Sequence, residues 1–276
     1  MSHPPSDIRS LPIRRDLRAL FIVSLLIAGL VATVSVVGLL SSSGTYPTEA
    51  LQQTFIPNDV VILFVGLPIL VVSFWRAWHG SLIGLLCWPG ALCYMLYNYV
   101  AYVYAVPFGW MLLLYISLAV MCAYALVGLM IAIDGRVVRE RLGGALPEKA
   151  IGAVIAGMGL LFLLRMIGVM VTAIVGSAAM PRTEIAVNLS DATIAPAWII
   201  GGVVLWRRQE VGYAGALGLL VQGSMLFVSL VAWLVLQPVL TAGSLSVIDI
   251  VVVLAMGMIC FVPCAMFMRA ILRTHA

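Results

Sequence analysis

The stretch ALFIVSLLIAGLVATVSVVGLL, from Ala19 to Leu40, contains no charged residue and decides the class of this protein. It is long enough to cross a bilayer as one helix, which takes about 20 mostly apolar residues. A secretory signal has a shorter apolar core of about 7–15 residues, so we expect the stretch to be retained as a first membrane span.

The rest of the chain has the same character. Of its 276 residues, 63% are hydrophobic and only 9% are charged, whereas soluble domains contain about 25% charged residues. This composition argues against a water-soluble enzyme, a disordered regulator and a nucleic-acid-binding protein. The sequence therefore predicts an all-α, polytopic integral membrane protein with eight transmembrane helices. We expect the spans at residues 18–41, 58–75, 81–105, 108–133, 150–174, 192–206, 213–236 and 247–268.

The basic residues lie on one side of these spans. All of the 15 lysines and arginines except Arg165 and Arg182 fall at the ends of the chain or in the loops of that side. They are Arg9, Arg14, Arg15, Arg18, Arg76, Arg136, Arg139, Arg141, Lys149, Arg207, Arg208, Arg269 and Arg273. Because basic loops stay in the cytoplasm, we expect both termini on the cytoplasmic side of a cell membrane. We expect this to be a prokaryotic plasma membrane. A seven-span arrangement would put one basic cluster outside.

The two halves of the chain resemble each other. The first half carries, in order, Pro47-Thr48-Glu49, Asn58-Asp59, Trp75-Arg76, Gly80 and Gly84. The second half carries Pro181-Arg182-Thr183-Glu184, Ser190-Asp191, Trp206-Arg207, Gly212 and Gly215. This order predicts two parallel four-helix repeats, related by an axis along the membrane normal. The expected units are residues 1–133, a cytoplasmic linker loop at 134–149, and residues 150–276.

Arg165 is the polar residue that most needs an explanation. It falls inside the fifth predicted span, where an arginine costs about 2.5–3.5 kcal/mol on insertion scales and cannot lose its charge. Asp249, near the outer end of span eight, is the acid we expect to pair with it. The alternatives are a binding site for an anion or a substrate headgroup, and a side chain that reaches out to the lipid headgroups.

A second candidate site lies on span three, where Tyr94, Tyr97, Asn98 and Tyr102 occupy one broad face of the predicted helix. These side chains could line a substrate-binding cavity together with Arg165 and Asp249. The competing interpretation is an interfacial aromatic belt with hydrogen bonds between helices. Tyr94 and Asn98 are too deep in the span for a belt.

The third feature is a set of outer acids that could attract cations to the mouth of a cavity. They are Glu49, Asp59, Glu184 and Asp191. Asp59 follows Asn58 and Asp191 follows Ser190, and both preceding residues are good N-caps. The alternative is therefore that these acids simply stabilise the first turns of two helices.

No catalytic signature accompanies these features. The sequence has no histidine pair with metal or haem spacing and no phosphate-binding glycine loop, and we expect no metal or cofactor. The five cysteines all fall within predicted spans, where thiols are common apolar fillers.

The leading hypothesis is a transporter or channel-like protein for a small solute or ion, with an outward-opening polar cavity. One alternative is an intramembrane enzyme that acts on a lipid or isoprenoid. Another is a non-catalytic membrane subunit or sensor. The expected partners are the lipid bilayer, a small solute, ion or lipid ligand, and further protein subunits or a second copy of the chain. No nucleic-acid partner is expected.

Overall fold

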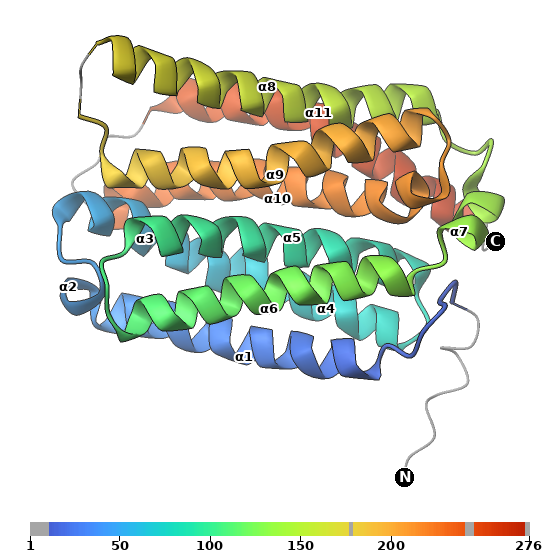
Figure 1. The fold of residues 1–276 in the computed structure, drawn as a ribbon, viewed down its shortest axis with the longest axis horizontal. Coiled ribbons are helices and arrows are strands. Elements are labelled where there is room, and N and C mark those ends of the chain that lie inside the picture. Colours follow the sequence, from blue (N-terminus) through green and yellow to red (C-terminus); the bar gives the residue numbers. More distant parts are fainter. Residues whose placement is uncertain (1–10, 177–178, 241–245, 274–276) are drawn as a thin grey trace.

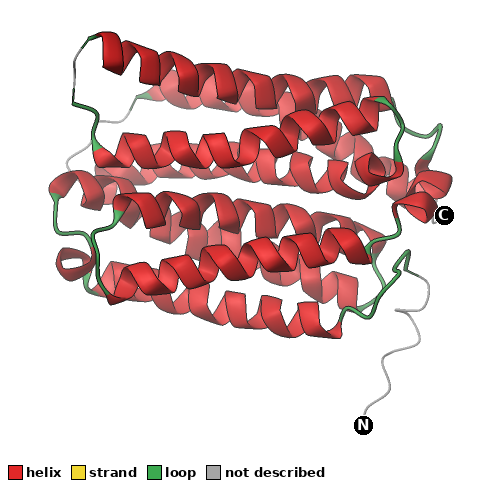
Figure 2. Cartoon of the chain, in the orientation of Figure 1, coloured by secondary structure: helices red, strands yellow, loops and turns green. Residues whose placement is uncertain are grey.

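The computed structural model describes residues 11–176, 179–240 and 246–273 and is all-helical over those ranges. Eight helical segments of the described residues are long and apolar enough to cross a membrane. The helices are α1 (Arg18–Leu40), α2 (Ser42–Thr45), α3 (Glu49–Val61), the π-helical segment η2 (Ile62–Gly66), α4 (Leu67–Trp78), α5 (Leu82–Ala105), α6 (Trp110–Ala132), α7 (Gly135–Leu142), α8 (Glu148–Val175), α9 (Arg182–Trp206), α10 (Glu210–Leu240) and α11 (Val247–Arg273). They form one elongated bundle (Figures 1 and 2).

The bundle has two distinct ends. α1 begins and α11 ends at the end that carries α7, which we call the α7 end (Figure 1). The opposite end carries α2 and the starts of α3 and α9, and we call it the α2 end.

The prediction of eight apolar, membrane-length helices is confirmed.

The second and sixth spans begin earlier than the sequence analysis predicted. α3 begins at Glu49, where the Thr48 hydroxyl accepts a hydrogen bond from the backbone N–H of Leu51. α9 begins at Arg182, and the carbonyl of Pro181 accepts the N–H of Glu184. The expected helix starts at residues 58 and 192 were wrong because polar residues inside the helices resembled N-caps.

The second span is not a uniform α-helix. α3, η2 and α4 run as one continuous segment from Glu49 to Trp78, and the wider π-helical turn lies directly before Pro68. Proline lacks an N–H and its ring clashes with the carbonyl four residues earlier. A π-bulge accommodates both defects and places this irregular turn next to Asn58 and Asp59.

α5 is the central helix of the bundle. It packs against α4, α6, α9 and α10 and is the most buried of the eight spans. Its Gly90 meets α10 at Gly218, so that the two backbones are in direct contact. Small residues at such a crossing allow two membrane helices to approach closely. The polar residues of α5 are therefore held between the two halves of the chain.

The α7 end is fastened by ion pairs between loops and helix ends. Arg14 contacts Asp134 at 2.9 Å, and Asp134 also accepts the backbone N–H of Arg136 as the N-cap of α7. The hydrogen bond from Arg14 is the main reason that the pKa of Asp134 is lowered. The segment at 134–149, expected to be a loop, thus contains the helix α7, which packs against α10.

Some contacts follow the order that a duplicated unit would produce. α5 of the first half packs against α9, while α10 of the second half packs against α3. Gly84 lies against the end of α4, and Gly212 lies in the same way against the end of α9. The two parallel four-helix repeats themselves remain a prediction.

Candidate functional site

Two buried carboxylates lie in the half of the bundle nearest the α2 end. Asp59 is ten residues into α3 and Asp191 is nine residues into α9, which places both about 14–15 Å from the helix starts. Their side chains are 2% and 1% exposed, respectively. The expectation that both acids occupy first helical turns is therefore corrected, and neither belongs to an exposed rim.

Asp191 is held by one residue from each of two neighbouring helices. Arg165 of α8 donates from Nη1 to Oδ2 at 2.9 Å, and Tyr97 of α5 donates its hydroxyl to Oδ1 at 2.9 Å. The Arg165 side chain is itself 50% exposed. One oxygen of this carboxylate is thus neutralised by a cation, while the other connects α9 to the central helix.

Asp59 is bound by hydroxyl groups. Tyr46 donates to Oδ2 at 2.6 Å and Tyr102 donates to Oδ1 at 2.8 Å. The Tyr46 hydroxyl also lies 3.4 Å from the hydroxyl of Tyr115. Asn58, next to Asp59, donates from Nδ2 to the Tyr102 oxygen at 3.2 Å. The two carboxylates therefore differ in kind: one is paired with an arginine, the other is surrounded by phenols.

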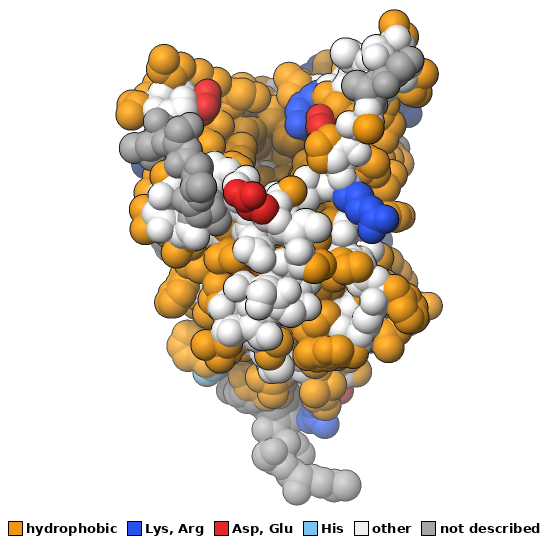
Figure 3. All heavy atoms as spheres, turned by 90° about the vertical axis from the view of Figure 1, so that its left-hand side faces the viewer, with side chains coloured by type: hydrophobic (Ala, Val, Ile, Leu, Met, Phe, Trp, Pro, Cys, Tyr) orange, Lys and Arg blue, Asp and Glu red, His pale blue; other side chains and the backbone are white. Residues whose placement is uncertain are grey.

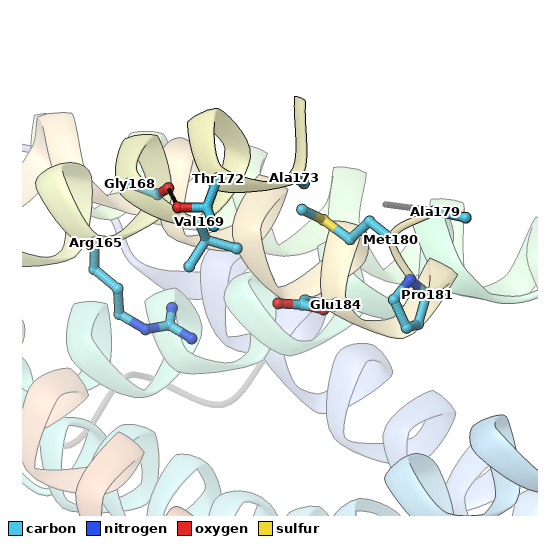
Figure 4. Close-up of a pocket in the computed structure, with 9 residues that line it drawn as sticks. All are labelled: Arg165, Gly168, Val169, Thr172, Ala173, Ala179, Met180, Pro181 and Glu184. Carbon is cyan, nitrogen blue, oxygen red and sulfur yellow. Dashed lines mark hydrogen bonds between the residues drawn. The ribbon is translucent and has the colours of Figure 1, made fainter. Parts of the chain in front are cut away.

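A cavity of about 560 Å³ opens beside Arg165 at the α2 end. Its lining residues are Arg165, Gly168, Val169, Thr172, Ala173, Ala179, Met180, Pro181 and Glu184. In Figure 4 the guanidinium of Arg165 and the carboxylate of Glu184 point toward the same space. Figure 3, which looks onto this end of the molecule, shows a hollow between two projecting parts, with mostly apolar walls.

The cavity carries two opposite charges that do not pair with each other. Glu184 makes no ion pair within the described residues, and Arg165 uses only Nη1 toward Asp191. The remaining guanidinium N–H groups of Arg165 have no partner in the described part of the chain and are available to a ligand. Among the described residues that line the cavity, Thr172 is the only one with a hydroxyl group, and it donates to the carbonyl of Gly168.

The structure separates the residues that the sequence analysis grouped on span three. Tyr94 contacts Ser229 of α10 through a 2.7 Å hydroxyl pair, and Asn98 accepts a hydrogen bond from Asn58. Tyr102 binds Asp59, and Tyr97 binds Asp191. None of the four is among the residues that line the cavity beside Arg165. They instead hold α5 to three neighbouring helices.

The predicted pairing of Arg165 with Asp249 is wrong. Asp249 is exposed in the first turn of α11, where its backbone N–H is bonded to the hydroxyl of Ser246. Arg165 lies ten residues before the end of α8, at the depth of Asp191 and far below that of Asp249. The remaining predicted acids, Glu49 and Glu184, are exposed in the first turns of α3 and α9.

Sequence reasoning missed several members of these clusters. Tyr46 lies outside the predicted spans, and Ser35 of α1 is a buried hydroxyl in an otherwise apolar run. At the α7 end, the nearly buried Glu148 accepts the hydroxyl of Tyr213 at 2.9 Å and faces Arg208 at 3.5 Å. Arg165 and Asp191 come to the same depth only when α9 is counted from its start at Arg182, which the sequence pattern did not indicate.

No group of His, Cys, Asp and Glu residues within the described ranges has the arrangement to hold a metal ion. All five cysteines are buried as free thiols. Cys260 and Cys264, adjacent on one face of α11, are packed in the interior of the bundle.

The fold and the clusters define a class: an α-helical bundle of membrane-spanning length with buried carboxylates and a charged cavity at one end. Comparison of the chain with family models, curated proteins and solved structures finds no match.

Proposed function

We propose that this chain is a membrane transport protein that admits a small zwitterionic solute at the α2 end, through the cavity beside Arg165. The observation that carries the proposal is the open, mostly apolar cavity that presents an arginine and a glutamate without pairing them. A volume of about 560 Å³ lies within the range of about 300–1,000 Å³ usual for small-molecule pockets.

The charges suggest how the solute is oriented. A carboxylate on the solute would accept hydrogen bonds from the free guanidinium nitrogens of Arg165. Asp191 holds Nη1 of Arg165, and Tyr97 in turn donates to Asp191. An ammonium group would lie toward Glu184, while an apolar body would contact Val169, Ala173 and Met180. Solutes that carry one charge would leave the opposite charge of the cavity without a partner.

Three probes separate these contributions. Norleucine carries both charges, hexanoate is the same molecule without the amino group, and pentylamine is the same molecule without the carboxylate. Binding to the purified chain in detergent is measured by isothermal titration calorimetry. We expect norleucine to bind most tightly. Arg165→Gln should weaken the binding of norleucine about tenfold, a change of about 1.4 kcal/mol. Glu184→Gln should make norleucine bind no more tightly than hexanoate.

Arg182→Gln is the matched control, because Arg182 is an exposed arginine at the same end of the bundle but does not line the cavity. Equal effects of Arg165→Gln and Arg182→Gln would contradict a specific site. Transport itself is tested by counterflow of labelled norleucine in proteoliposomes. If norleucine binds but no counterflow occurs, the protein is a receptor and the transporter proposal is rejected.

A zwitterionic lipid headgroup offers the same chemistry and supports a second candidate, a protein that acts on lipid. The observation in its favour is that α8 lines the cavity with Val169 and Ala173 while Val171 and Ile174, on the same turns, are exposed on the surface. If phosphatidylethanolamine in nanodiscs, but not phosphatidylglycerol, competes with norleucine through Arg165, the lipid candidate is favoured.

A further inference from the structure

Asp59 is a buried acid that faces no cation among the described residues. It contacts no Lys, Arg or His within ion-pair distance in the described part of the chain, in contrast to Asp191 with Arg165. An ionised aspartate within a membrane span costs about 2.5–3.5 kcal/mol when it has no partner. The hydroxyls of Tyr46 and Tyr102 offset part of this cost, because each donates a hydrogen bond to one carboxylate oxygen.

The surroundings of Asp59 also contain hydroxyls that lack a partner. The oxygens of Ser35 and Tyr99 are buried without a hydrogen bond, and Ser35 lies beside both the Asp59 carboxyl and Tyr99. A hydroxyl can donate or accept, depending on how it rotates. Ser35 can therefore donate to an ionised Asp59 or accept from a protonated one, so the cluster can satisfy either state.

The backbone of α1 closes one side of the carboxylate. A methyl group on Gly38 would overlap Oδ2 of Asp59 and would lie 2.8 Å from the Tyr46 oxygen. A proton on Oδ2 fits this close packing.

From these observations we propose that Asp59 is a proton-binding site, which takes up and releases one proton while the hydroxyls of Ser35, Tyr46 and Tyr102 reorient. The titratable groups that face it are Tyr46, Tyr99, Tyr102 and Tyr115. The proton comes from water and returns to water, and no electrons are transferred. The inference does not depend on the solute proposed at Arg165.

Infrared difference spectroscopy of the full chain in nanodiscs, labelled with ¹³C-aspartate, tests this site. A carbonyl stretch of protonated aspartic acid should appear as the pH is lowered to about 5, where aspartates with the ordinary pKa of about 3.9 are still mostly ionised. This band should be absent in Asp59→Asn and should persist in Asp191→Asn. Tyr102→Phe, which removes one hydrogen-bond donor, should shift the midpoint of this band by about one pH unit.

Three outcomes would overturn the proposal. The first is a spectrum of the folded chain in which no protonated-aspartate band titrates above about pH 5. The second is a band that survives in Asp59→Asn. The third is a midpoint that moves when sodium replaces N-methylglucamine, because that would indicate an alkali-cation site. If Asp59→Asn fails to fold, the labelled wild-type chain and Tyr102→Phe still decide the question.

Discussion

Gly90 of α5 and Gly218 of α10 touch through their backbones: a methyl group added to Gly90 would overlap the carbonyl oxygen of Gly218. This crossing joins the first half of the chain to the second at the most buried helix. The positions of Tyr94, Tyr97 and Tyr102 relative to α9, α10 and α3 therefore depend on it.

Gly90→Ala should consequently destabilise the bundle by about 1–3 kcal/mol, the usual cost of overpacking a tight interior. Unfolding can be followed with a thiol-reactive dye, because all five cysteines are buried in the native chain. Gly29→Ala is the control, since a methyl group there meets no atom within 4 Å. Equal melting temperatures for the two variants would contradict the close crossing.

The ion pair at the α7 end predicts a pH dependence. Arg14 lowers the pKa of Asp134, so the pair stabilises the fold above the ordinary aspartate pKa of about 3.9 and loses its effect as pH falls through the lowered value. Asp134→Asn keeps an N-cap for α7 but removes the charge. Its melting temperature should be below that of wild type at pH 7, and this difference should shrink as the pH falls below the ordinary aspartate pKa of about 3.9.

The control for this experiment is Glu140→Gln, which removes an exposed pair with Arg136 within α7. A surface pair of this kind contributes little, so the variant should match wild type. A gap for Asp134→Asn that persists or widens at low pH would show that the charge of Asp134 is not its cause.

The fold class was predictable because long apolar runs dominate the sequence, and the helices α1, α5 and α6 begin within two residues of the expected positions. The starts of the second and sixth spans were not predictable in the same way. Asn58-Asp59 and Ser190-Asp191 look like helix caps in sequence, yet they are interior residues. Ser190 donates to the carbonyl of Ala186 within its own helix, while Asn58, Asp59 and Asp191 have partners outside theirs. Local sequence does not contain those tertiary partners.

The same error hid the partner of Arg165. With Asp191 expected in the first turn of its helix, at the outer end, Asp249 was the acid nearest in expected depth. Because α9 begins at Arg182, Asp191 lies about 14 Å along the helix from its start, which is the depth of Arg165 in the bundle. The two charged residues of the cavity, Arg165 and Glu184, were candidates from sequence. That they share a cavity was not predictable, because its other walls are mostly ordinary apolar residues of α8 and of the segment before α9.

The orientation of the bundle can be tested by labelling. The basic residues predict that the α7 end faces the cytoplasm. A cysteine at the exposed Ser43 should react with an impermeant thiol reagent added to intact cells, and one at the exposed Gly143 should react only after lysis. Ser190 and Ala77 are unsuitable positions because both are fully buried. The reverse pattern would place the α2 end inside.

The native cysteines need no removal in this experiment, because all five are buried. The unmodified chain supplies the background, and it should remain unlabelled under both conditions. Labelling of Gly143→Cys in intact cells would reject the cytoplasmic placement of the α7 end.

The last prediction concerns the pair between α8 and α9. Arg165→Ala leaves Asp191, which is 1% exposed, without its cation. Because Arg165 is itself half exposed, water replaces part of the lost interaction, and we expect a loss of roughly 1–3 kcal/mol. Asp191→Asn can still accept the hydroxyl of Tyr97. In the double variant, Arg165→Ala with Asp191→Asn, part of the loss should therefore be recovered, since removing one partner costs more than removing both.

Asp249→Asn provides the comparison for this cycle, because Asp249 is the acid that sequence alone would pair with Arg165. Its carboxylate is exposed, so combining Asp249→Asn with Arg165→Ala should recover nothing. The measurement is the melting temperature of each single and double variant in the same detergent, read through cysteine exposure. Recovery with Asp249→Asn, or strictly additive losses with Asp191→Asn, would show that Arg165 is balanced by a different acid from the one this structure assigns.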